Sequence, residues 1–158
     1  MRELDSKNLM IRNANSMDAG DLIDSFMDKL IVEECAFPLI KNSSELKKFL
    51  DTYKKNLYVG VNKRNFKVET LVSFIKGEIN FFTVSEDQNS GFMKETLSVL
   101  LKEFFLLDSN LVKIVGTIFP SNSIAIKLLE DFGFKYEKET KKIKGKGVEK
   151  ALSYSLLR

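Results

Sequence analysis

The pattern of hydrophobic and polar positions predicts about four helices along the chain. The first is expected to begin after Ser16, a residue that can cap a helix, and to end before Pro38. The others are expected to begin near Ser43, near Ser90 and at Asn122. The apolar faces of the first three helices are Leu22, Ile23, Phe26 and Leu30; Leu46, Phe49, Leu50 and Tyr53; and Leu97, Leu100, Leu101 and Phe104. Each stripe is typical of a helix that packs one face on a sheet.

Strand-like segments lie before, between and after these helices. They cover residues 9–12, 57–61, 68–75, 78–84, 111–118, 134–140 and 148–157. Short turns join the second, third and fourth segments, which predicts an antiparallel meander. The third helix separates 78–84 from 111–118, so these two strands are expected to lie parallel through a right-handed crossover. The mostly apolar segment 111–118 is expected to be buried on both faces.

The order of these elements, β-α-α-β-β-β-α-β-α-β-β, predicts a mixed α/β (α+β) fold. We expect a mostly antiparallel sheet of about six or seven strands, flanked by about four helices. Neither a repeat nor a linker divides the 158 residues, so residues 1–158 are predicted to form a single domain.

Composition narrows the class of protein. No apolar run is long enough to cross a bilayer, and residues 1–7 lack the apolar core of a signal peptide, so no membrane association is expected. The one cysteine, Cys35, cannot form an internal disulfide, and the cytoplasm is the expected compartment. The mild net charge of +3, with both signs interspersed, makes nucleic acid an unexpected partner. We interpret the basic segment 141–147 as a solvated hairpin turn, with a docking site for acidic groups as the alternative.

Histidine is absent from the sequence, which excludes several chemistries. A Ser-His-Asp or Cys-His hydrolase cannot be built, and few ligands remain for zinc, so no metal is expected. General acid–base catalysis would therefore have to use carboxylates, tyrosines, lysines or water.

The turn from residue 85 to residue 93 is a candidate phosphate site. It joins a strand to a helix, whose first N–H groups are unpaired and lie at the positive end of the helix dipole. Gly91 allows the backbone to approach a ligand closely. The alternative is that this turn only caps the helix, and Glu86 and Asp87 favour that alternative.

The segment from Asn122 to Phe134 combines a helix N-cap with an amphipathic helix and a glycine stop at Gly133. Its pattern N-x-x-A-x-x-L-L-x-x-x-G-F resembles the second signature motif of GNAT acetyltransferases. Gln88-x-x-Gly91-x-Met93 resembles the first motif, which binds the pyrophosphate of coenzyme A. The run G-F-M-K-E-T-L from Gly91 and the closing A-L-S-Y-S-L resemble the ribosomal-protein (RimJ/RimL-type) branch. The resemblance extends from about Leu57 to the end of the chain.

The resemblance implies a GNAT-like acyl-CoA-binding domain whose sheet is splayed at the central parallel pair. Its activity would be transfer of the acetyl group of acetyl-CoA to a primary amine, on a protein N-terminus or a small molecule, by direct attack. The backbone of 82–84 would pair with the pantetheine arm, and a backbone N–H near Thr83 or Val84 would polarise the thioester carbonyl. The implied acetyl-CoA contacts are Phe82, Thr83, Val84, Gln88, Asn89, Ser90, Gly91, Phe92, Met93, Lys94, Asn122 and Leu129.

The resemblance also implies catalytic roles. Glu78 would act as the base through a water molecule, although it is equally well read as a turn residue. Asn122 would hold the pantetheine or an ordered water. Leu129 stands where many members have a tyrosine that protonates the departing thiolate. Ser123, with Ser121 and Tyr136, is a candidate substitute, and water is the alternative.

Two further residues differ from the family pattern: Met93 replaces the usual small residue, and Asn89 replaces a glycine common in the RimJ/RimL-type branch. Each would narrow the approach to the phosphates. Leu129 and Met93 favour an alternative function, a catalytically weak or inactive GNAT-like domain that binds acyl-CoA or a protein partner. Family members often form dimers, so a homodimer is possible. The segment from Ile31 to Asn42 and the basic hairpin loop are expected to decide the acceptor.

Overall fold

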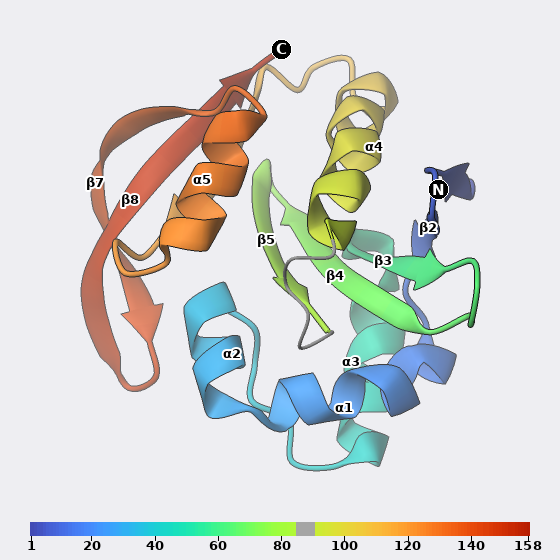
Figure 1. Ribbon diagram of the computed structural model, residues 1–158. Helices are drawn as coiled ribbons and strands as arrows, with labels where there is room; N and C mark the ends of the chain where they lie inside the picture. The colour runs from blue at the N-terminus through green and yellow to red at the C-terminus, as the bar shows by residue number, and fades with distance from the viewer. Residues whose placement is uncertain (85–90) are drawn as a thin grey trace.

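A computed structural model describes residues 1–84 and 91–158, and the strands in these residues form one mixed sheet (Figure 1). The strands are β1 (Leu4–Asp5), β2 (Leu9–Asn13), β3 (Leu57–Asn62), β4 (Val68–Ile75), β5 (Glu78–Thr83), β6 (Lys113–Ile118), β7 (Lys135–Lys144) and β8 (Gly147–Leu157). Their order across the sheet is β1-β2-β3-β4-β5-β6-β8-β7. Only β5 and β6 pair in parallel, and the predicted meander of β3, β4 and β5 is confirmed.

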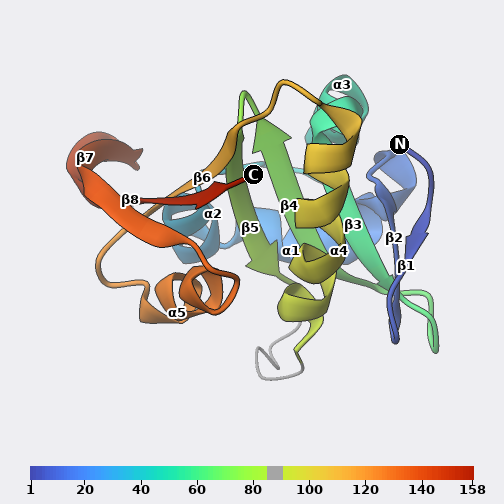
Figure 2. The ribbon, with the colours of Figure 1, turned by 90° about the horizontal axis from the view of Figure 1, so that it is seen from above.

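Helices cover both faces of the sheet (Figures 1 and 2). They are α1 (Ala19–Met27), α2 (Lys29–Cys35), α3 (Ser43–Tyr53), α4 (Phe92–Leu107) and α5 (Ser123–Asp131). The first three lie on one face, and α4 and α5 lie on the other. Among the described residues, no helix is both long enough and apolar enough to cross a membrane.

Each face of the sheet has its own apolar core. Leu97 and Leu100 of α4 and Leu129 of α5 pack with Ile79 on one face. On the other face, Phe26 of α1 contacts Phe82 of β5 edge to face, with ring centroids 5.5 Å apart. Burial of these side chains on both faces supplies most of the force that holds the layers together.

The first predicted helix is in fact two helices. Asp28 has an extended backbone and its carboxylate accepts a hydrogen bond from the N–H of Leu30 at 3.0 Å, so it ends α1 and caps α2. Leu30 is consequently 75% exposed to solvent and does not belong to the buried apolar face that its spacing in the sequence predicted. The expected cap at Ser16 was also wrong, because the side chain of Asn15 caps the short 3-10 turn that precedes α1.

Three other differences concern the sheet. The two-residue strand β1 adds an eighth strand, and with α2 the structure has five α-helices where about four were expected. Strand β6 is buried on one face only, because Ile114, Gly116 and Ile118 are buried while the residues between them are half-buried. At the end of α5, Gly133 has a φ of 90°, as expected of the predicted glycine stop, and the Phe134 N–H donates to the Leu129 carbonyl.

The parallel pair is short, and this splay positions the site. Pairing between β5 and β6 is limited to Glu78 with Val115 and Ile79 with Gly116, although β5 continues to Thr83 and β6 to Ile118. We call the unpaired region beyond Ile79 and Gly116 the splay. Its presence confirms the predicted opening at the central parallel pair.

Candidate active site

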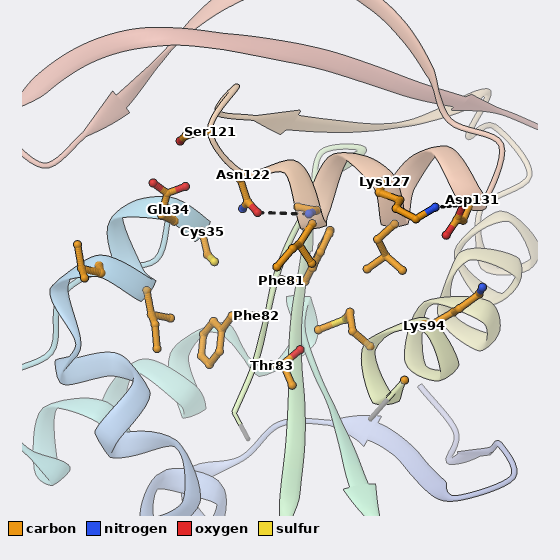
Figure 3. A pocket seen from close by; sticks show the side chains of 17 residues that line it. Glu34, Cys35, Phe81, Phe82, Thr83, Lys94, Ser121, Asn122, Lys127 and Asp131 are labelled. Carbon is orange, nitrogen blue, oxygen red and sulfur yellow. Dashed lines mark hydrogen bonds and ion pairs between the residues drawn. The ribbon is translucent and has the colours of Figure 1, made fainter. Parts of the chain in front are cut away.

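A cavity of about 730 Å³ lies along the splay, between the two helical layers (Figure 3). Four segments far apart in the sequence bound it: α2, the end of β5, the start of α4, and α5 with the loop before it. The lining residues are Leu30, Ile31, Glu34 and Cys35; Phe81, Phe82 and Thr83; Gly91, Met93 and Lys94; and Ser121, Asn122, Ile124, Ala125, Lys127, Leu128 and Asp131. A cavity of this size is typical of small-molecule and cofactor sites.

The edge of β5 that faces the cavity is not paired with β6. The Val84 N–H donates to the Glu69 carbonyl of the neighbouring segment at 2.8 Å. Because backbone groups of an antiparallel strand alternate between its two edges, Phe82 and Asn80 face β4, while Phe81 and Thr83 face the splay. Val84 therefore does not offer its N–H to the cavity, and of the two predicted oxyanion donors only Thr83 remains.

The start of α4 opens on the same cavity, and no side chain among residues 1–84 and 91–158 caps it. Gly91 has a φ of 79°, a conformation that glycine adopts without strain. The first intrahelical bond runs from the Glu95 N–H to the Gly91 carbonyl at 3.0 Å. The N–H groups of Phe92, Met93 and Lys94 therefore have no partner within the helix. With the positive end of the helix dipole and the Lys94 ammonium, they favour an anion at this end of the cavity.

The acidic residue in the first turn of α4 is held away from this anion site. The Glu95 carboxylate accepts hydrogen bonds from the Ser6 hydroxyl, at 2.5 Å, and from the backbone and side chain of Asn8. Partial burial raises the pKa of Glu95, but the hydrogen bonds from Ser6, Asn8 and Leu9 outweigh it and lower the pKa below its ordinary value.

The second signature segment contributes one predicted residue to the cavity and leaves two outside its lining. Asn122 lines the cavity, and its side-chain oxygen accepts the Ala125 N–H at 3.2 Å, which caps α5 as predicted (Figure 3). Ser123 is exposed and lies outside the lining, whereas Ser121 lies within it. Leu129 is fully buried beneath Gly116, and its neighbour Leu128 reaches the cavity instead.

Glu78 lies at the closed end of the splay, outside the cavity lining. It begins β5 and pairs with Val115. By strand alternation its side chain shares a face with Asn80 and Phe82, the face that carries α1, α2 and α3. The predictions on Gln88, Asn89 and Ser90 lie outside the described residues.

The sequence did not predict the charged groups that α2 and the β7–β8 hairpin bring to the site. Glu34 and Cys35 of α2 line the cavity, and burial raises the pKa of the Cys35 thiol to about 12. The Lys144 ammonium donates to the Glu34 carboxylate at 2.8 Å. A second cavity, of about 840 Å³, lies on the other side of this contact and is lined by α2, residues 36–39 and the hairpin tip.

The interpretation of the basic segment 141–147 as a solvated turn is therefore corrected. Strands β7 and β8 extend to Lys144 and Gly147, which leaves only Gly145 and Lys146 in the turn. The side chains of Lys142 and Lys144 on β7 both contact other parts of the protein. The Lys142 ammonium donates to the Thr117 carbonyl at 2.7 Å and to the Asn80 side chain at 3.3 Å.

Comparison with known proteins agrees with this geometry. Residues 11–150 match the model of the acetyltransferase (GNAT) domain family. No curated protein matches the sequence.

Solved structures with the same fold cover nearly the whole chain. A GNAT-family acetyltransferase from Bacillus anthracis is 16% identical with a TM-score of 0.85, over 99% of this chain and 98% of that chain. The ribosomal-protein-S5-alanine acetyltransferase from Vibrio fischeri is 21% identical with a TM-score of 0.82, over 99% and 97%. The ribosomal L7/L12 α-N-protein acetyltransferase RimL, solved in complex with coenzyme A, is 14% identical with a TM-score of 0.82, over 99% and 98%.

The splayed parallel pair, the uncapped helix start beside it and the family match lead to one assignment. The chain belongs to the GNAT family of acetyl-CoA-dependent acetyltransferases.

Proposed function

We propose that this chain transfers the acetyl group of acetyl-CoA to a primary amine by direct attack of the amine on the thioester. One observation carries the proposal: the cavity is bounded by the unpaired edge of β5 and by the uncapped start of α4. The two features suit the two parts of the acetyl-CoA molecule that need hydrogen bonds, its amide-containing arm and its pyrophosphate.

The residues present fit this ligand. The backbone of Phe81 and Thr83 would pair with the amides of the pantetheine arm, as an added strand does. The N–H groups of Phe92, Met93 and Lys94 would hold the pyrophosphate. The Lys94 ammonium lines the cavity from α4 and adds positive charge there, whereas Lys127 lines it from α5 in an ion pair with Asp131 at 3.6 Å. The Phe81 N–H, which lies nearer the closed end of the splay than the Thr83 N–H, would polarise the thioester carbonyl, so the arm would pair mainly at Thr83.

Glu78 is the proposed base. Its position on the α2 face of β5 suits an amine that approaches from that side, and proton removal through a water would not require Glu78 to line the cavity. Asn122 would hold the arm of acetyl-CoA or an ordered water, since its side-chain nitrogen is not used in capping α5. Ser121, within the cavity lining, replaces Ser123 as our candidate for the group that protonates the thiolate.

We favour a protein N-terminus as the acceptor. The second cavity extends along α2 and the hairpin tip, the two segments expected to decide the acceptor, and offers room for residues that follow a terminal amine. Two structurally similar enzymes are ribosomal-protein acetyltransferases, which supports a peptide substrate.

Calorimetric titration with acetyl-CoA, followed by turnover assays on peptides and small amines, tests the proposal. We expect binding in the micromolar range and turnover of at least one primary amine. Glu78→Gln should retain binding and lose turnover by about 10²-fold or more, the usual contribution of a general base. Glu139→Gln, on an exposed glutamate of β7, is the matched control and should behave as the unmodified protein. Absence of binding at about 1 mM acetyl-CoA, near −4 kcal/mol, would refute the proposal.

A second function is supported by one specific observation. Leu129 occupies the position of the usual tyrosine and is fully buried, so it offers neither a hydroxyl nor access to the thioester. A weak or inactive domain that binds acyl-CoA, or a protein partner, is therefore the alternative. Micromolar binding of acetyl-CoA without turnover of any amine would favour an acyl-CoA-binding domain.

A further inference from the structure

The Lys142 ammonium lies at the closed end of the splay. Register pairing of β5 with β6 stops at Ile79 and Gly116, so Asn80 and Thr117 are the next residues on the two strands. Because the Val115 N–H donates to the Gly77 carbonyl, the Thr117 carbonyl, two residues on, is also directed toward β5. Lys142 donates to that carbonyl at 2.7 Å and to Asn80 at 3.3 Å, and so bridges the two strands where their own pairing ends.

The thioester of acetyl-CoA is expected at this same end. The anion site lies at the start of α4, and the unpaired edge of β5 runs from Thr83 back through Phe81 toward Ile79. An arm whose pyrophosphate lies at α4 and whose amides pair with this edge must direct its far end toward the closed end of the splay. The acetyl group is at that far end.

The surroundings of Lys142 suit a nucleophile. Its ammonium lies 5.3 Å from the centroid of the Phe119 ring and is partly withdrawn from water. Burial lowers the pKa of Lys142 below its ordinary value of 10.5, although the charges of Glu78, Cys35 and Glu34 oppose this effect. A lysine with a lowered pKa provides more of the neutral amine that attacks a thioester.

Lys144 provides an internal comparison. It lies on the same face of β7, two residues away, and its ammonium lies 4.9 Å from the same Phe119 ring. Its hydrogen bond to Glu34 raises its pKa and holds it in the charged form. The pKa values of these two neighbouring lysines are thus shifted in opposite directions.

We infer that Lys142 is an amine acceptor within the chain and is acetylated at Nζ by acetyl-CoA bound to the same molecule. The inference rests on the proposed acetyl-CoA site. The ammonium first loses one proton to solvent, with Glu78 as the nearby carboxylate. The Nζ–C bond forms as the C–S bond breaks, and a second proton passes from nitrogen to sulfur. The products are N-acetyl-lysine and the thiol of coenzyme A.

The test is incubation of the protein with acetyl-CoA and no added amine, followed by mass spectrometry of the intact chain and of its peptides. We expect one acetyl group, on Lys142, added at least about tenfold faster than on any exposed lysine, because the amine and the thioester are held together. The rate should be independent of protein concentration, as a reaction within one molecule requires. Lys142→Arg, which keeps the charge, should abolish this modification, whereas Lys144→Arg should leave it in place.

Two results would overturn the inference, and neither depends on turnover of an external amine. Acetyl groups spread over exposed lysines, with Lys142 no faster than the rest, would show ordinary solution chemistry. A Lys142 rate proportional to protein concentration would place the reaction between molecules. Calorimetric titration of the same sample separates the two proposals: bound acetyl-CoA with unmodified Lys142 refutes only the inference on Lys142, whereas absence of binding refutes the acetyl-CoA site itself.

Discussion

The Lys144 ammonium donates to the Glu34 carboxylate at 2.8 Å and thereby joins the tip of the β7–β8 hairpin to helix α2. This contact lies between the cavity along the splay and the second cavity beneath the hairpin tip. The hairpin and α2 form the two walls through which an acceptor would approach, so their relative position bears directly on substrate binding.

Lys144→Met should therefore weaken binding of the acceptor and spare that of acetyl-CoA. Loss of one partly exposed ion pair predicts a rise in KM for the amine of up to about fivefold. Steady-state kinetics with the amine varied, and calorimetry with acetyl-CoA, provide the two measurements. Lys141→Met is the matched control, because Lys141 precedes Lys142 on β7 and its side chain is exposed. Equal effects of the two substitutions would argue against a role for the contact with Glu34.

Gly91→Ala should reduce both stability and acetyl-CoA affinity. No neighbour in the described part of the chain would obstruct an added methyl group, so the effect comes from the φ of 79°, which costs a non-glycine residue about 1 kcal/mol or more. Relief of that strain would rotate the N–H groups at the start of α4, and we expect affinity to fall by about tenfold. Gly20→Ala is the control, because Gly20 lies in α1 with open space around it and should gain about 0.5–1 kcal/mol. Urea unfolding and calorimetry measure the two quantities.

Gly116→Ala should destabilise the fold through Leu129. A Cβ at position 116 would lie 2.8 Å from the Leu129 Cδ1 atom, in a fully buried environment where Leu129 has little room to move. We expect a loss of about 1–3 kcal/mol in the free energy of unfolding. Leu129→Ala alone should cost about 2–5 kcal/mol, and the double variant should cost less than the sum by about 1 kcal/mol. Additive losses would contradict the contact.

Glu95→Gln should change the dependence of stability on pH at the acid end. The pKa of Glu95 is lower in the folded protein than its ordinary value of 4.5, so the unfolded chain binds more protons between the two values. The stabilisation is present above pH 4.5 and is lost as the pH falls through the folded pKa. Urea unfolding of both proteins across this range should show a shallower decline in the variant. Parallel curves would indicate that the hydrogen bonds from Ser6 and Asn8 do not stabilise the charged form.

Much of the fold was predictable because its signals are local. The short turns that join β3, β4 and β5, the cap at Asn122 and the left-handed Gly133 each depend on a few residues close together in the sequence. The parallel pair followed from the helix between β5 and β6, since only a crossover can bring such strands side by side. The division of the first helix was missed because the apolar spacing continues across Asp28, although Asp28 is itself a residue type that favours helix starts.

The sequence by itself thus determined the elements, their order and the two motifs that border the cavity. Only the tertiary structure decided that Glu34 meets Lys144, which lies 110 positions away, and that Lys142 meets Asn80 and Thr117. It also decided that Thr83, and not Val84, presents its N–H to the splay. The physical reason is distance along the chain. Periodicity and caps report interactions between near neighbours, whereas the direction of a charged side chain on a hairpin depends on which distant surface the folded sheet brings beneath it.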